Sequence, residues 1–177
     1  EDGMSLVVCH ELGHHIAGAP KVRSIFGTSW AANEGQADYF GTLKCFRKVF
    51  RSENNVAIVA SLNVPQLVTN KCVTSLQLQG IPTTDAGYAN ELALCKRGAM
   101  AGLTLGSVLG SLGSPAVVPH FDTPNVSEVR STYDGHPEAQ CRLDTYFAGA
   151  VCAVRDTVDT SETDVKAGTC NQGTDSI

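Results

Sequence analysis

The sequence predicts a mainly α-helical fold with little or no sheet, formed by one domain or lobe over residues 1–177. Long segments have the apolar spacing and the end signals of helices, whereas strand signals are sparse. A chain of 177 residues that is 42% apolar and 18% charged is also able to bury a core. The formal net charge of −5 at pH 7 argues against a nucleic-acid-binding protein, because such proteins carry a basic surface.

The first part of the chain predicts two helices joined by a connector. Residues 4–18 are apolar and end at a glycine, which is typical of a helix C-terminus. Residues 19–32 contain Pro20 and Gly27 and are expected to form the connector. Residues 33–50 form the second predicted helix, because acidic residues in its first turn and basic residues in its last turn suit the helix dipole.

The middle of the chain predicts two short helices, near residues 54–62 and 65–78, and one long helix over residues 85–112. Along the long helix four glycines recur every four residues and share one stripe: Gly98, Gly102, Gly106 and Gly110. A stripe of this kind indicates close packing of a buried helix. A membrane span is the alternative, but the segment is rich in Gly, Ser and Thr and is poorly apolar for one.

The last third of the chain predicts a loop over residues 113–135, a helix over residues 137–154 and an irregular tail from Thr157 onward. Pro137 suits the first turn of that helix. We interpret a group of acidic residues at the start of the tail as a solvated surface, because it lacks the spacing of a calcium-binding loop: Asp156, Asp159, Glu162 and Asp164.

Seven cysteines are many for a cytosolic domain of this size, and they contain no CxxC pair: Cys9, Cys45, Cys72, Cys95, Cys141, Cys152 and Cys170. Disulfides in a secreted or periplasmic protein are the better interpretation. Because seven is an odd number, at least one thiol is left over within this chain.

The predicted helices restrict how these cysteines pair. Cys141 and Cys152 lie on one helix, roughly 16 Å apart along its axis, whereas bridged Cα atoms lie within about 7 Å. We expect a Cys152–Cys170 bridge and a further bridge within a set of four cysteines: Cys45, Cys72, Cys95 and Cys141. Cys9 lies within the first helix and is expected to be the free thiol.

The residues with the clearest chemical meaning lie in the first helix, where His10, Glu11 and His14 form an HExxH motif. Positions i and i+4 share one helix face, so both imidazoles reach one metal ion. Glu11 is next to His10 and is placed to reach a water on that metal. His15 is rotated about 100° from the ligand face and is expected to be an ordinary surface residue.

A catalytic zinc site needs a third protein ligand and an open fourth position. Nineteen residues separate His14 from Glu34, which opens the second predicted helix and is placed to be that ligand. Asp38 follows one turn later on the same face, where it is able to hydrogen-bond a ligand imidazole and fix its tautomer.

This pattern, HExxH followed after nineteen residues by Glu34 and Asp38 in an ExxxD arrangement, resembles the thermolysin type of gluzincin metallopeptidase. The resemblance implies a zincin-type lobe in which the HExxH helix packs on the third-ligand helix. It implies that His10, His14 and Glu34 bind zinc. The Asn-Glu-Gly start of the second helix is also similar to the gluzincin aminopeptidases, whose spacing is one residue shorter.

A second resemblance lies near the C-terminus, where His136-Pro137 and Arg142 are similar to a motif of the CAAX-protease/HtpX-type metallopeptidases. In that group the histidine lies near the catalytic cleft, although the gap between HExxH and the third ligand is longer there. The metzincins are excluded, because Pro20 stands where their third histidine belongs.

The resemblance implies a zinc-dependent endopeptidase acting on a protein or peptide substrate. A bound zinc ion supplies a Lewis acid and an activated water, and Glu11 is the expected general base. His136 is the first candidate to stabilise the oxyanion and Tyr133 the second. Arg142 and Asp144 are otherwise expected to be helix-surface or cap residues, and His120 a loop residue.

The strand that aligns substrate in gluzincins precedes the HExxH helix. The chain starts at Glu1 without a signal peptide, so we expect that a missing N-terminal segment or a partner chain completes the cleft. The main alternative is a non-catalytic zinc-binding domain that mediates protein interactions. Against it stands Glu11, for which a purely structural zinc site has no use. A membrane association is the least favoured alternative.

Overall fold

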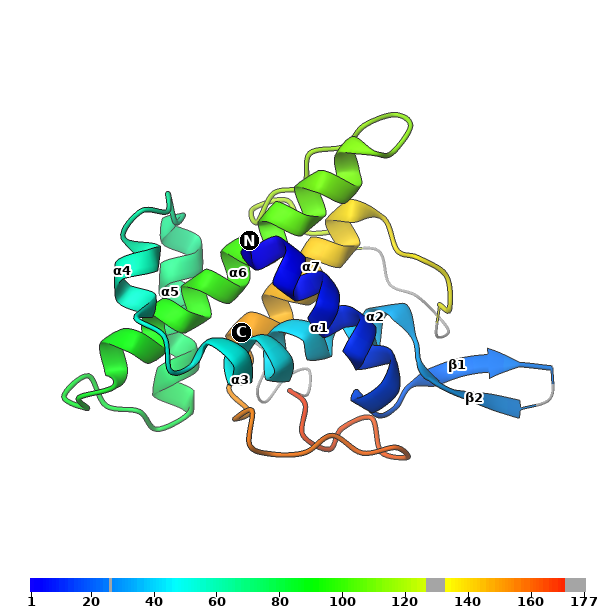
Figure 1. Cartoon of the computed structure of the whole chain (residues 1–177), viewed down its shortest axis with the longest axis horizontal. Coiled ribbons are helices and arrows are strands. Elements are labelled where there is room, and N and C mark those ends of the chain that lie inside the picture. Colours follow the sequence, from blue (N-terminus) through cyan, green and yellow to red (C-terminus); the bar gives the residue numbers. More distant parts are fainter. Residues whose placement is uncertain (26, 127–132, 171–177) are drawn as a thin grey trace.

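The computed structural model describes residues 1–25, 27–126 and 133–170, and within them the chain is mainly helical, as the sequence predicts (Figure 1). The first helix, α1, spans Asp2–Ile16. A hairpin follows, in which β1 (Lys21–Ser24) pairs antiparallel with β2 (Gly27–Ala32). The hairpin lies inside residues 19–32, for which the sequence predicts only a connector. The two strands there are not predicted.

The predicted second helix is one continuous helical segment of three parts. It begins as α2 (Glu34–Phe40), widens into the π-helix η1 (Gly41–Phe46) and ends as α3 (Arg47–Phe50). Lys44 of η1 and Arg47 of α3 are both buried, against the C-terminal end of the last helix and the segment that follows it. There Lys44 Nζ donates to Arg155 O, and Arg47 donates to the carbonyl oxygens of Ala150 and Cys152.

Four further helices complete the described fold. They are α4 (Asn55–Val59), α5 (Gln66–Leu78), α6 (Tyr88–Ser111) and α7 (Ala139–Val151). In Figure 1, α4 and α5 lie at one end of the molecule, the hairpin projects from the other end, and α6 crosses the middle. Both α1 and α7 pack on α2, η1 and α6. These contacts bring the HExxH helix, the third-ligand helix and the His-Pro segment together.

The glycine stripe of α6 has the predicted role of close helix packing. A Cβ atom on Gly102 would lie 2.7 Å from Cβ of Tyr146, so only glycine lets α6 and α7 approach this closely. The helix is long and apolar enough to cross a membrane, because one stretch of it has a mean hydropathy of 1.2. Half of that stretch is buried within the fold. The packing of α6 on α7 agrees with the prediction of a buried helix.

Three disulfides connect the described elements: Cys9–Cys45, Cys72–Cys95 and Cys152–Cys170. The predicted Cys152–Cys170 bridge is confirmed, and so is a bridge within the set of four. The prediction of a free thiol at Cys9 was wrong, because this side chain faces η1 in the core, and the free cysteine is Cys141. Disulfides in this number are typical of extracellular or periplasmic proteins.

The tail was also partly misjudged. Asp156 is buried rather than solvated, and its carboxylate accepts a hydrogen bond of 2.6 Å from Arg51. Glu162 remains exposed, although it forms an ion pair with Lys21 of the hairpin. The tail therefore packs across the helical segment and the hairpin, which the sequence alone does not indicate because its partners lie more than a hundred residues away.

Candidate metal centre

Three side chains from two helices converge on one point. His10 and His14 project from one face of α1, and Glu34 is the first residue of α2. One ligand atom from each residue lies within 4.8 Å of the other two. His10 Nε2 is 3.3 Å from Glu34 Oε2, and His14 Nε2 is 3.5 Å from Glu34 Oε1. The spacing read from the sequence therefore brings the three predicted ligands together.

Local structure explains why Glu34 stands at this point. Asn33 is the N-cap of α2, and its side chain accepts a hydrogen bond of 2.9 Å from the backbone of Gln36, which fixes the start of the helix. Gln36 in turn donates to Ala17 O at the end of α1. Gly13 lets the two helices touch, because a Cβ atom there would lie 2.9 Å from Cα of Ala37.

The other nitrogen of each imidazole has an acceptor beside it. His10 Nδ1 lies 2.7 Å from Asp38 Oδ1, and His14 Nδ1 lies 2.8 Å from the carbonyl oxygen of Ala32. A carboxylate and a carbonyl both require Nδ1 to carry the proton, which leaves the Nε2 lone pairs directed toward Glu34. Asp38 thus occupies the position that the sequence predicts for it beside a ligand histidine.

Arg142 on α7, which the sequence indicates only through the resemblance of the His-Pro motif, is part of this site. The expectation of a surface or cap role was wrong, because its side chain is buried and forms two hydrogen bonds with Asp38, of 2.9 and 2.6 Å. Its Nη2 atom also lies 3.3 Å from His10 Nδ1 and donates to the hydroxyl of Tyr146 at 3.0 Å. Asp144 is half-buried in the middle of α7, where its carboxylate accepts a hydrogen bond from the backbone of Asn125.

The charges in this cluster shift the pKa of its members. Burial alone lowers the pKa of Arg142, but the hydrogen bonds and the negative charge of Asp38 outweigh burial and raise it above its ordinary value. Burial raises the pKa of the Tyr146 hydroxyl, and the charge of Asp38 raises it further. The cluster therefore consists of a charged pair, Asp38 and Arg142, with a neutral phenol beside it.

The donor set fits a metal ion. Glu34 Oε2 is buried and, among the described residues, accepts no well-aligned hydrogen bond, although nitrogens of His10 and His136 lie 3.3 and 3.0 Å from it; a cation at this point would compensate its burial. Two imidazole nitrogens and one carboxylate oxygen form the three-ligand set of catalytic zinc sites. The residues present thus suit a metal ion.

The other predicted site residues differ in where they lie relative to the three converging side chains. Glu11 is exposed on α1, directly after the ligand His10. His136 is exposed, and its Nδ1 lies 3.0 Å from Glu34 Oε2, at the edge of the cluster. Tyr133 is also exposed, but it lines a separate hollow with Asn33 and Cys141. His136 thus directly contacts one of the three converging residues.

The remaining histidines lie outside the cluster. The His15 ring packs on the Trp30 ring of β2, with centroids 4.7 Å apart, and both side chains are exposed. His120 is an exposed loop residue whose backbone bonds to Gln140. Comparison with protein-family models, with curated proteins and with solved structures finds no match for this chain.

Proposed function

We propose that this chain is the catalytic domain, or a lobe of it, of a zinc-dependent endopeptidase of gluzincin type. The observation that carries the proposal is the convergence of His10, His14 and Glu34 on one point, with the exposed Glu11 directly after His10 in α1. A site that only stabilises a fold has four protein ligands and no neighbouring base. Three ligands and an adjacent exposed carboxylate fit hydrolysis.

Zinc bound at these ligands supplies a Lewis acid and an activated water. Glu11 would serve as the general base of the hydrolysis and would return the proton to the amine that leaves the substrate. His136 is placed at the edge of the cluster to donate a hydrogen bond to the oxyanion that develops on the substrate carbonyl. Asp38, held by Arg142, keeps His10 in the tautomer that binds metal.

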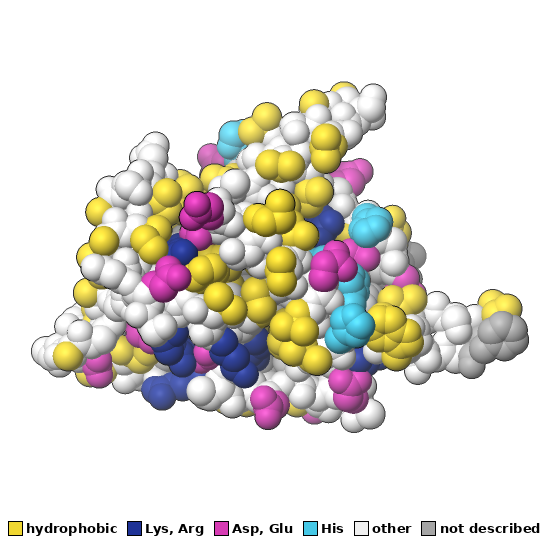
Figure 2. Space-filling model, in the orientation of Figure 1, with side chains coloured by type: hydrophobic (Ala, Val, Ile, Leu, Met, Phe, Trp, Pro, Cys, Tyr) yellow, Lys and Arg dark blue, Asp and Glu magenta, His cyan; other side chains and the backbone are white. Residues whose placement is uncertain are grey.

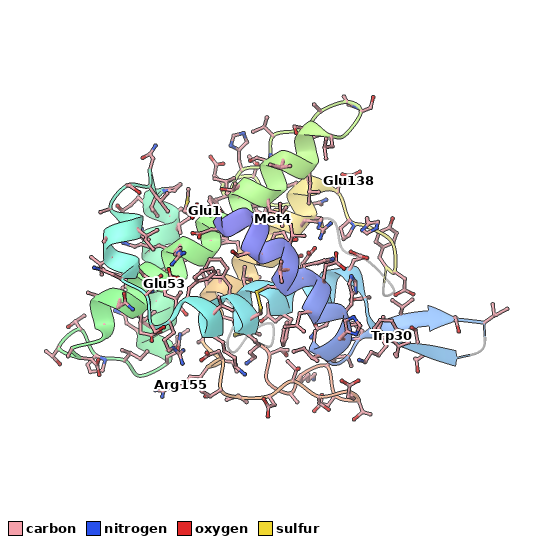
Figure 3. All side chains as sticks on the ribbon, viewed as in Figure 1. Glu1, Met4, Trp30, Glu53, Glu138 and Arg155 are labelled. Carbon is pink, nitrogen blue, oxygen red and sulfur yellow. A yellow bond between two sulfur atoms is a disulfide. The ribbon has the colours of Figure 1, made fainter. Side chains whose placement is uncertain are left out.

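The outer face of α1 favours the presence of a further element that covers it. That element is either an N-terminal segment or a partner chain. Besides the side chains that it buries in the core, the helix carries a second line of apolar side chains at four-residue spacing. Met4 is 70% exposed and Val8 is 64% exposed, and Leu12 and Ile16 are exposed on the same side. Figure 2 shows hydrophobic side chains over α1 next to the histidines, and Met4 points outward in Figure 3. We propose that this element forms the missing wall of the cleft.

The same exposed face favours one alternative, a non-catalytic zinc-binding domain that uses α1 to bind another protein. The three disulfides support export to a periplasmic or extracellular compartment in either case. The two functions differ in what Glu11 does, because only hydrolysis needs its carboxylate.

Hydrolysis of casein by the zinc-loaded chain tests the proposal. We expect the wild-type protein to cleave casein and Glu11→Gln to lose activity by about 100-fold or more, because the general base is removed. Glu1→Gln, which changes an exposed carboxylate at the start of the same helix, is the matched control and retains activity. Bound zinc without casein cleavage in the wild type would instead favour the binding domain.

A further inference from the structure

A hollow of about 300 Å³ lies apart from the candidate metal centre, where the segments after α3 and before α6 meet the segment that follows α7. It is lined by Arg51 directly after α3, by Asp85 and Glu91 on either side of the start of α6, and by Arg155 and Asp156. None of its lining residues contributes to the candidate metal centre. Its volume is at the lower end of the range of about 300–1,000 Å³ for ligand pockets, so it suits a small molecule.

Asp156 places a buried carboxylate against this hollow. The residue is 1% exposed, and its Oδ1 atom accepts a hydrogen bond of 2.6 Å from Arg51. Its Oδ2 atom is also buried and has no hydrogen-bond partner among the described residues. A buried carboxylate oxygen without a donor is unfavourable, so the Oδ2 atom favours a ligand with a positively charged N–H group.

Two buried cations near Asp156 are bound elsewhere. The negative charge of Asp156 acts on the pKa of both Lys44 and Arg47, where it offsets part of the lowering that burial causes. Lys44 Nζ nevertheless donates to Arg155 O at 2.7 Å, and Arg47 donates to carbonyl oxygens at the C-terminal end of α7. These bonds hold the backbone around the hollow and leave the Oδ2 atom of Asp156 without a donor from either cation.

Arg155 provides the complementary charge at the exposed side of the hollow. Figure 3 shows Arg155 and the hairpin residue Trp30 toward opposite ends of the molecule. The Arg155 side chain is exposed, its Nη2 atom donates to Gln79 O at 3.3 Å, and it forms no ion pair within the residues that the structure describes. A guanidinium is a planar group of N–H donors that pairs with both oxygens of a carboxylate. Arg155 is therefore suited to bind the carboxylate of a ligand.

The charges that line the hollow favour a zwitterion over a metal ion. Among the described residues, the one group of three or more side chains whose ligand atoms come close enough to share a metal ion is the candidate metal centre. The hollow instead combines three carboxylates with two guanidinium groups. A ligand with a single charge meets repulsion from part of this lining, whereas a ligand with both charges pairs with both kinds of group.

We propose that this hollow binds a free α-amino acid, whose ammonium group donates to the Oδ2 atom of Asp156 and whose carboxylate accepts from Arg155. These two residues are adjacent in the chain and line the same hollow, which suits a ligand whose two charges are joined through one carbon atom. Ile81 also lines the hollow and is half-buried, which favours an amino acid with an apolar side chain. The inference goes beyond the proposed function and does not depend on it, because hydrolysis uses none of these residues.

Calorimetric titration of the whole chain with L-leucine tests the inference. We expect a Kd of about 1 mM or tighter, which is the affinity that a ligand of this size provides. N-acetyl-L-leucine lacks the ammonium group, and L-leucine amide lacks the carboxylate. Each should bind at least about 10-fold more weakly than L-leucine, because each loses one charged hydrogen-bond partner.

Variants locate the bound amino acid. Arg155→Gln removes the charge of an exposed side chain, and Asp156→Asn removes the buried charge with little change of shape. We expect each to weaken L-leucine binding by about 10-fold or more. Because Arg155 is exposed, Arg155→Gln keeps the fold even if Asp156→Asn does not. Arg23→Gln, at an exposed arginine of the hairpin, is the matched control and binds L-leucine as the wild type does, and so does Glu34→Ala, which alters the candidate metal centre.

Weaker binding of both blocked ligands, together with a loss of affinity in Arg155→Gln but not in Arg23→Gln, supports the site. No heat of binding up to about 10 mM L-leucine, or equal binding of L-leucine and the two blocked ligands, would overturn it. Unchanged affinity in Arg155→Gln would overturn it as well. A loss of binding in Glu34→Ala would also do so, because it would place L-leucine at the candidate metal centre instead.

Discussion

Two pairs of helices in this protein are each joined by a disulfide, but their interiors differ. Cys9–Cys45 joins α1 to η1, and Cys72–Cys95 joins α5 to α6. Both cysteines of the first bridge belong to an apolar cluster, and the interior beside it also holds the charged or titratable side chains of His10, Asp38 and Arg142. The interior beside the second bridge is an apolar cluster: Val68, Ala99, Ala150 and Val151.

This difference distinguishes the kind of interior that a stable fold requires from the kind that a functional site requires. Burial of charged groups has a large desolvation cost, and apolar residues of similar volume often give an equally stable core. The α5–α6 pair shows that this chain builds such a core where no site lies nearby. The buried polar side chains beside the α1–η1 bridge contact the candidate metal ligand His10, which is the arrangement that a metal centre needs.

The largest effect is expected from Arg142→Leu. This change leaves the buried carboxylate of Asp38 without its bidentate partner, so we expect the free energy of unfolding to fall by about 3–5 kcal/mol in urea denaturation. Arg155→Leu, at an exposed arginine that bonds to Gln79 O, should change it by only about 0.5 kcal/mol. A small loss in Arg142→Leu would show that Asp38 does not depend on this partner.

The two bridges give a direct test of the comparison. Removing Cys9–Cys45 or Cys72–Cys95 by paired Cys→Ala substitutions should cost a similar amount, about 3–4 kcal/mol, because the sequence separations of 36 and 23 close loops of comparable entropy. Only the loss of Cys9–Cys45, next to His10, should also weaken zinc affinity in a chelator competition. Equal effects of the two pairs on zinc affinity would contradict the distinction.

A further test concerns the buried charge of Lys44. This residue lies on the same helical segment as Glu34, but its side chain is not directed at the candidate metal ligands. Burial lowers its pKa from 10.5 to about 8, and the charge of Arg47 acts in the same direction. Between pH 8 and 10.5 the unfolded chain therefore binds more protons at this residue than the native chain, so its destabilising effect decreases as the pH rises. Relative to Lys44→Met, the wild type should gain up to ~3 kcal/mol across this window. Parallel stability curves would contradict the shift.

A smaller effect is expected at the glycines that set helix spacing. Gly13→Ala places a Cβ atom 2.9 Å from Cα and O of Ala37 and should cost about 1–3 kcal/mol and move the ligands on α1 away from Glu34. In Gly98→Ala the new atom lies 3.5 Å from Phe46, which is an ordinary contact, and we expect little change. Thermal unfolding and zinc titration of the two variants measure both consequences.

The sequence predicted the helices to within a few residues because each has its own apolar spacing and end signals, as in α5 and α6. It also placed His10, His14 and Glu34 together, because their spacing is local to two consecutive helices. The hairpin was missed because its strands are short and largely exposed, so apolar alternation is weak. The helix signals, the spacing of the three ligands and the weak alternation of the strands are all properties of short segments.

Long-range partners could not be read in the same way. Arg142 and Asp38 are 104 residues apart, and an arginine in an amphipathic helix usually faces solvent. Cys9 was taken as the free thiol because nothing in α1 alone shows that it faces Cys45. In both cases the packing of separate helices decides the role of the residue, and no local pattern records that packing.

Metal content measured by mass spectrometry tests the central claim most directly. The account predicts about one zinc per wild-type chain, loss of that zinc in Glu34→Ala, and its retention in His15→Ala, the exposed histidine next to a ligand. A wild-type protein that takes up no zinc after the metal is added back, or a Glu34→Ala variant that binds as much as the wild type, would contradict it.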